Sequence, residues 1–188
     1  MQRPVTPPLT AANSIPKKTV EELDKERAER RQKEKQGNKA FSTKPKTIVY
    51  VVTASWCGYC TRLKQSIFLG MGMTNDENVN AILEQRNKIM EKKTIASDQM
   101  ATLLRDFSNH LLERGMITLY EDKDVVIQLL ENETSDKQTQ SIISFILPSA
   151  FPTYYAVSAD SNVKQLNVNA PNKSRTYITW LNDILQKA

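Results

Sequence analysis

The sequence contains few of the residues that build metal centres or disulfide frameworks. Its 188 residues include two cysteines, Cys57 and Cys60, and one histidine, His110. A structural zinc site needs four ligands, so zinc would require a carboxylate or a second subunit to complete the set. His110 borders the apolar stripe of a predicted helix, where a histidine is typically a partly buried surface residue. We therefore predict no metal site.

Long apolar segments are also missing from the sequence. The first 18 residues, MQRPVTPPLTAANSIPKK, hold three prolines among the first eight and lack the apolar run that a secretory signal needs. No segment is long and apolar enough to cross a bilayer. We expect a protein without a membrane span, in a reducing compartment that is cytoplasmic or part of an intracellular or viral assembly. There a C-x-x-C pair is typically catalytic or metal-binding, and a structural disulfide is unusual.

The positive charge of the chain is confined to its N-terminal quarter. Residues 1–46 hold 12 Lys and Arg against 6 Asp and Glu, a net of 12 − 6 = +6, and residues 47–188 hold 14 − 15 = −1. The run TVEELDKERAERRQKEKQ has good helix formers but almost no apolar face, so we predict a charged extension over 1–46 that is not core. Its mixed signs favour a solvated helix over a nucleic-acid-binding tail. A protein partner for the extension stays open.

The remaining residues, 47–188, have the pattern of one α/β domain. The run TIVYVVTA, residues 47–54, is apolar and β-branched, which fits a central strand covered on both faces. A helix is predicted directly after it, opening at Cys57 and continuing through Cys60. A cysteine at a helix N-terminus has its thiolate stabilised by free backbone N–H groups and by the helix dipole.

Further elements follow from apolar spacing and from turn residues. The run MITLY, residues 116–120, is predicted as a second buried strand, and the acidic stretch 120–124 as a strand end leading into a polar turn. A β-hairpin is predicted across the turn at 160–162. Helical periodicity predicts helices at 77–94, at 98–114 between Ser97 and Gly115, at 135–147 before Pro148, and at the C-terminus with Tyr177, Trp180, Leu181, Ile184 and Leu185 on one face.

The order of these elements carries a family resemblance. With Trp56-Cys57-Gly58-Tyr59-Cys60 and Phe151-Pro152-Thr153, the chain resembles the thioredoxin superfamily over residues 47–68 and 116–188. The resemblance implies a thioredoxin-like three-layer α/β sandwich, with a central mixed sheet of about four strands and flanking helices. The separation of Cys60 and Pro152, 152 − 60 = 92, is more than a minimal member needs. We therefore predict an inserted helical pair at about 77–115.

The resemblance also implies a function and a set of roles. Cys57 would be the nucleophile and Cys60 would resolve the mixed disulfide, so the chain is expected to be a thiol–disulfide oxidoreductase acting on protein dithiols and disulfides. No metal or organic cofactor would be required. The Phe151–Pro152 bond is expected to be cis. The residues expected to contact substrate are Trp56, Tyr59, Phe151, Pro152 and Thr153.

Two residues depart from the family pattern. Thioredoxins have a buried Asp six residues before the first cysteine that relays its proton, whereas this chain has Val51, which argues against rapid thioredoxin-style reductase chemistry. Tyr59 stands where thioredoxins usually have Pro, and is closer to the aromatic of glutaredoxins. A second hypothesis therefore stays open: a thioredoxin-fold structural or adaptor subunit of a large assembly, for example a virus particle, whose dithiol is idle or only structural. Val51, the charged extension and the helical insertion support it.

Overall fold

The computed structural model describes residues 46–92, 97–171 and 176–188. All of them belong to one of the two units into which the chain divides, Thr43–Ala188, the other unit being Met1–Ser42. The predicted N-terminal extension, apart from Lys46, lies outside the described residues. Within the described part of the chain, no helix has both the length and the apolar character that crossing a membrane requires.

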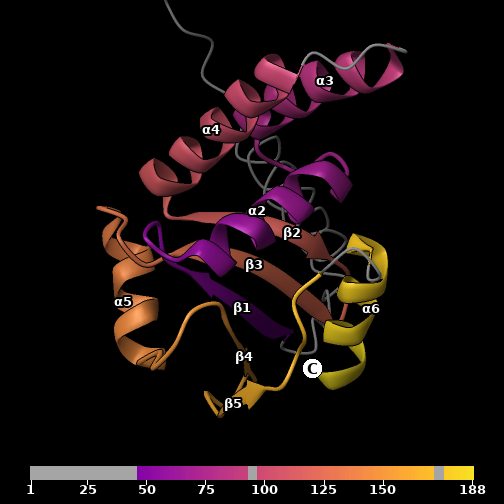
Figure 1. Cartoon of the computed structure of the whole chain (residues 1–188). Coiled ribbons are helices and arrows are strands. Elements are labelled where there is room, and N and C mark those ends of the chain that lie inside the picture. Colours follow the sequence, from indigo (N-terminus) through magenta and orange to yellow (C-terminus); the bar gives the residue numbers. More distant parts are fainter. Residues whose placement is uncertain (1–45, 93–96, 172–175) are drawn as a thin grey trace, which may run out of the picture. The chain divides into compact units, whose positions relative to one another are not determined.

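An open mixed sheet of five strands forms the centre of the described unit (Figure 1). The strand β1 runs parallel to β3 and antiparallel to β4, and the outer strands β2 and β5 are each antiparallel to their neighbours. In order across the sheet, the strands are β2 (Met116–Glu121), β3 (Val125–Glu131), β1 (Thr47–Thr53), β4 (Thr153–Val157) and β5 (Val163–Leu166).

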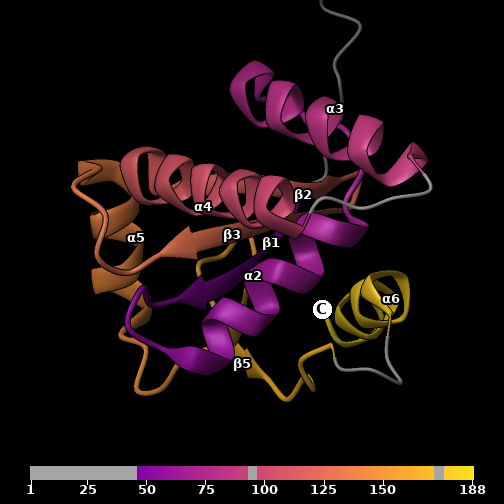
Figure 2. The ribbon, with the colours of Figure 1, turned by 45° about the horizontal axis from the view of Figure 1, so that its top comes forward.

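Helices cover both faces of this sheet. Val49 and Val51 point into one apolar cluster that includes residues of α2, α3, α4 and α6, and Tyr50 and Val52 point into a second cluster with α5. Figure 2 shows α2 and α4 lying across the strands, with α3 packed beside α4. The helices are α2 (Gly58–Gly70), α3 (Glu77–Glu91), α4 (Ser97–Arg114), α5 (Lys137–Ile146) and α6 (Tyr177–Lys187).

This architecture confirms the prediction of an α/β domain with helices around a mixed sheet, and it is compatible with a thioredoxin-like fold. The helices at 77–94 and 98–114 are present as α3 and α4, and the hairpin as β4 and β5. Gly115 ends α4 with a φ of +77°, and a Cβ there would lie 2.5 Å from Thr139 Oγ1. Only glycine therefore suits this turn from α4 into β2.

The expected number of strands was wrong. The sheet has five strands because Val125–Glu131, with the sequence VVIQLLE, forms β3 beside β1. A short turn joins β2 to β3, in which Asp122 Oδ1 accepts hydrogen bonds from the backbone N–H groups of Asp124 and Val125, both at 2.7 Å. The run at 116–120 is consequently an edge strand with mostly half-buried residues, and the buried position next to β1 belongs to β3.

A buried arginine fastens the end of α2 to α3. Arg86 is 5% exposed, and its Nη1 donates hydrogen bonds to the carbonyl oxygens of Phe68 and of Met71, the latter at 2.9 Å. Its guanidinium carbon lies 5.8 Å from the centre of the Phe68 ring. The last carbonyls of a helix lack partners within the helix and carry partial negative charge, so a buried cation there is stabilising.

We expect Arg86→Ala to lower the free energy of unfolding by about 3 kcal/mol, because buried carbonyls lose charged donors and the apolar stem is also lost. Urea unfolding of the purified protein measures this change. The control is Lys88→Ala, an exposed residue of the same helix, which should change the free energy by no more than about 0.5 kcal/mol. Equal effects of the two substitutions would contradict this role of Arg86.

Candidate functional site

The two cysteines stand where β1 passes into α2. Beyond β1 the backbone turns so that the Cys57 N–H donates to the Ala54 carbonyl at 3.3 Å. Cys57 is then the N-cap of α2, with extended backbone angles, and its Sγ accepts a hydrogen bond from the Cys60 N–H at 3.3 Å. The sequence prediction of a helix opening at Cys57 is confirmed.

The two thiols are both free, and they differ in their surroundings. Cys60 is fully buried and Cys57 keeps 7% of its surface exposed. Burial raises the pKa of Cys60, and its hydrogen bond to Cys57 raises it further, to about 12. Cys57 is therefore the sulfur that a reagent or substrate can reach first, whereas Cys60 stays protonated beneath it.

The loop before β4 closes over the first cysteine. The Cys57 thiol donates to the carbonyl oxygen of Phe151 at 3.4 Å, and the Phe151 ring packs on the cluster that holds both cysteines. The Phe151–Pro152 bond is cis, as expected. Thr153 is buried as the first residue of β4, where it pairs with Val52 of β1. The structure thus brings the Phe151 segment to the dithiol through the pairing of β4 with β1.

Aromatic side chains border the dithiol on the solvent side. Trp56 is 72% exposed and meets the ring of Phe151 edge-on, with 5.7 Å between the ring centres. Tyr59 is 71% exposed, and the guanidinium carbon of Arg62 lies 6.0 Å from the centre of its ring. Large exposed aromatic groups on a protein surface offer contact area to a protein partner.

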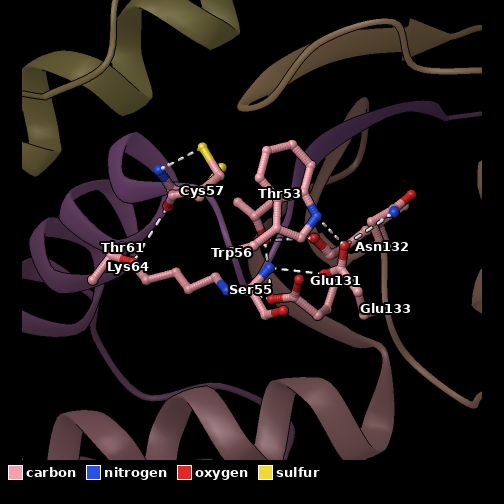
Figure 3. Close-up of polar contacts among 11 residues, drawn as sticks. Thr53, Ser55, Trp56, Cys57, Thr61, Lys64, Glu131, Asn132 and Glu133 are labelled. Atoms are coloured by element: carbon pink, nitrogen blue, oxygen red, sulfur yellow. Dashed lines mark hydrogen bonds and ion pairs between the residues drawn. The ribbon is translucent and has the colours of Figure 1, made fainter.

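A carboxylate that the sequence analysis did not identify anchors the loop before Cys57 (Figure 3). Glu133 Oε1 accepts from the Trp56 indole N–H at 2.8 Å and from Asn132 Nδ2 at 3.2 Å, and Oε2 accepts from the Ser55 N–H at 2.7 Å. Partial burial acts to raise the pKa of Glu133, but interactions with the Ser55 amide, with Glu131 and with Asn132, in that order, lower it to about 2. Glu133 is therefore ionised at any ordinary pH.

A buried polar pair lies below this loop. Lys64 Nζ contacts Glu131 Oε2, and the two side chains are 7% and 1% exposed. Thr53 Oγ1 donates to the Leu130 carbonyl at 2.8 Å and lies 3.5 Å from Glu131 Oε2. Burial raises the pKa of Glu131, and Lys64 offsets only part of that rise. Lys64 follows Cys60 by four residues, so both lie on one face of α2.

Lys64, Glu131 and Glu133 were missed because β3 was missed. Two sequence signals could have identified Glu131 and Lys64: a glutamate ending the apolar run VVIQLLE, and a lysine on the apolar side of α2 among Leu63 and Ile67. Val51, which stands at the position of the acid in the family pattern, is fully buried in the main core. The acidic group of this site comes from β3 and not from β1.

His110 has a structural role at a different point of the fold. Its Nε2 lies 2.8 Å from Oδ2 of Asp76, which caps α3 by accepting from the N–H groups of Asn78 and Val79. Among residues 46–92, 97–171 and 176–188, no group of three or more His, Cys, Asp or Glu side chains is placed to hold a metal ion.

Comparisons with known proteins do not assign this site. No protein-family model matches the sequence, and a search of curated proteins finds no match either. The chemistry of the site must therefore be argued from its own geometry.

We expect iodoacetamide at near-neutral pH to modify Cys57 of the reduced native protein at least about tenfold faster than Cys60, because the thiolate is the reactive form and Cys60 is buried with a raised pKa. Peptide mass spectrometry after partial alkylation measures both rates. In urea the two cysteines should react alike. Faster modification of Cys60 in the native protein would contradict the assigned order.

Proposed function

We propose that this chain is a thiol–disulfide oxidoreductase of the thioredoxin type, acting on protein dithiols and disulfides through Cys57 and Cys60. The observation that carries the proposal is the placement of Cys57 at the N-terminus of α2, one helical turn before a buried thiol and against the Phe151 carbonyl. A mixed sheet with helices on both faces is compatible with the fold that this function needs.

In the proposed reaction the Cys57 thiolate attacks one sulfur of a substrate disulfide. The substrate S–S bond breaks, a mixed disulfide forms, and one substrate thiolate leaves. Cys60 then loses its proton and attacks Cys57 Sγ, which forms the Cys57–Cys60 disulfide and releases the second substrate thiolate. Two electrons pass to the substrate, and the two released thiolates take up protons. An external dithiol returns the chain to its reduced form, and the reverse sequence oxidises a substrate dithiol.

The surroundings of the two sulfurs favour this order of steps. The Cys60 N–H and the positive end of the α2 dipole stabilise negative charge on Cys57. Burial is the largest cause of the raised pKa of Cys60, and the hydrogen bond and charge of Cys57 add to it. A mixed disulfide at Cys57 removes the hydrogen bond and the charge through which Cys57 raises the pKa of Cys60. Cys60 therefore becomes easier to deprotonate at the step in which it must attack.

The rim of the site supports protein substrates. Trp56 and Tyr59 expose large rings beside Cys57, and the Phe151 segment lies across its other side. A folded or extended polypeptide can contact these groups while its sulfur reaches Cys57. All groups that react in the proposed cycle are sulfur atoms of the chain, the substrate and the resetting dithiol, so no metal or organic cofactor takes part.

One observation favours the second hypothesis, a structural or adaptor subunit with an idle dithiol. Both thiols are buried, and Cys57 exposes only 7% of its surface. The two hypotheses differ in a measurable way. An active dithiol exchanges reversibly with glutathione or dithiothreitol mixtures in a two-electron transition, whereas an idle one resists both oxidation and labelling.

We expect Cys57→Ser to keep the fold and lose disulfide exchange, because it removes the nucleophile, and Cys60→Ser to accumulate mixed disulfides, because it removes the resolving thiol. Insulin reduction measures the first effect, and non-reducing electrophoresis of the native extract measures the second. The double variant Cys57→Ser, Cys60→Ser is the control for non-specific capture. If Cys60→Ser captures no more protein than this control, the proposed function is contradicted.

A further inference from the structure

Two carboxyl groups meet below the loop that carries Trp56 and Cys57. Glu131 Oε1 is buried and accepts no hydrogen bond from any described residue. Contact between the two carboxyl groups shifts their pKa values in opposite directions, that of Glu131 upward and that of Glu133 downward, and Figure 3 shows the two side chains below Trp56. Two ionised carboxylates repel each other and cannot form a hydrogen bond. One proton between them converts the repulsion into a carboxyl–carboxylate hydrogen bond.

The surroundings decide which of the two groups holds this proton. Glu133 accepts from three N–H groups, and each of these bonds favours its ionised form. Glu131 is 1% exposed, and Lys64 contacts its Oε2. Charge counting agrees with this assignment. With a neutral Glu131, the charges of Lys64 and Glu133 sum to zero, whereas two ionised glutamates would leave a net negative charge, with one of the two carboxylates, that of Glu131, buried.

We propose that Glu131 is a neutral carboxylic acid that donates its proton to Glu133, and that this bond holds Glu133 where it anchors Ser55 and Trp56 beside Cys57. A proton on Oε1 gives the unpartnered buried oxygen a bond to donate. Glu131 is thus a positioning residue for the loop before the nucleophile. Its effect on disulfide exchange rests on the proposed function, whereas its protonation and its effect on Trp56 do not.

The proposal fixes the direction of the pH dependence. The charged and polar groups that face Glu131 are Lys64 from α2, Thr53 from β1 and Glu133 from the segment after β3. Burial raises the pKa of Glu131, so the folded state keeps the proton at pH values where the unfolded chain has lost it. Stability from this bond is therefore complete at low pH and falls as pH rises from the ordinary glutamate value through the raised one.

The test compares Glu131→Gln with Glu131→Ala. Glutamine is neutral and keeps an N–H donor where the acid has its O–H, whereas alanine removes the donor. We follow the indole N–H of Trp56 by NMR, assigned with Trp56→Phe and distinguished from that of the buried Trp180. The Gln variant should keep the exchange rate of the wild type within about twofold, and the Ala variant should exchange at least about tenfold faster. Glu113→Gln, an exposed substitution on α4, is the matched control.

A titration of the wild-type protein gives a second measurement that does not depend on a variant folding. With ¹³C-labelled glutamate carboxyl groups, the Glu131 signal should titrate above the ordinary glutamate range, and the Trp56 indole signal should shift with it. In Glu131→Gln this shift should vanish. An ionised Glu131 signal throughout the range from about pH 5 to 8, or equal loosening of Trp56 in the Gln and Ala variants, would overturn the proposal.

The activity measurements separate this proposal from the proposed function. If the dithiol is active, insulin reduction should be kept in Glu131→Gln and reduced several-fold in Glu131→Ala. If the wild-type dithiol is idle, the proposed function fails, while the Glu131 titration and the Trp56 exchange rates still decide the present inference. An active wild type whose Ala variant keeps both full activity and a protected Trp56 indole would overturn the positioning role alone.

Discussion

β1 is buried on both faces and paired along both edges, and this placement decides which groups can meet the cysteines. Its last residue, Thr53, pairs with Glu131 at the end of the parallel strand β3, and Val52 pairs with Thr153 at the start of the antiparallel strand β4. These three strand ends, the end of β1, the end of β3 and the start of β4, therefore lie side by side at the same end of the sheet. This strand pairing brings together three parts of the chain that are distant in sequence: the loop that carries Cys57, the two glutamates and the Phe151 segment.

The site has an apolar upper layer and a polar lower layer. Above, Cys57 packs with Phe151, whose ring meets that of Trp56. Below, the fully buried Cys60 is followed on α2 by Lys64, which contacts Glu131. Polar groups this far from water are costly unless they are hydrogen-bonded. The lower layer is therefore tied to a single arrangement of α2 against β3. That arrangement also determines where the helix begins and where its first thiol lies.

The sequence predicted the parts of this design that depend on local pattern. β1, the helix opening at Cys57, the helices of the 77–115 region and the β4–β5 hairpin follow from apolar periodicity and turn residues, and the expected cis bond before Pro152 came from the family resemblance. β3 was not predicted, because its apolar run is interrupted by Gln128 and follows β2 after only three polar residues. Glu131 and Glu133 enter the site through the strand register, which no local pattern encodes.

The two outer strands have a consequence for how other chains can approach the sheet. β5 is only four residues long and exposes Lys164, and β2 ends at Glu121, which pairs with Lys46 at 2.7 Å. Short and charged edge strands disfavour the addition of a further strand from another molecule. The sheet is thus protected against edge-to-edge aggregation while its dithiol end stays bordered by exposed aromatic rings. Another protein chain is therefore more readily accommodated at the aromatic rim beside the dithiol than by strand addition at either edge of the sheet.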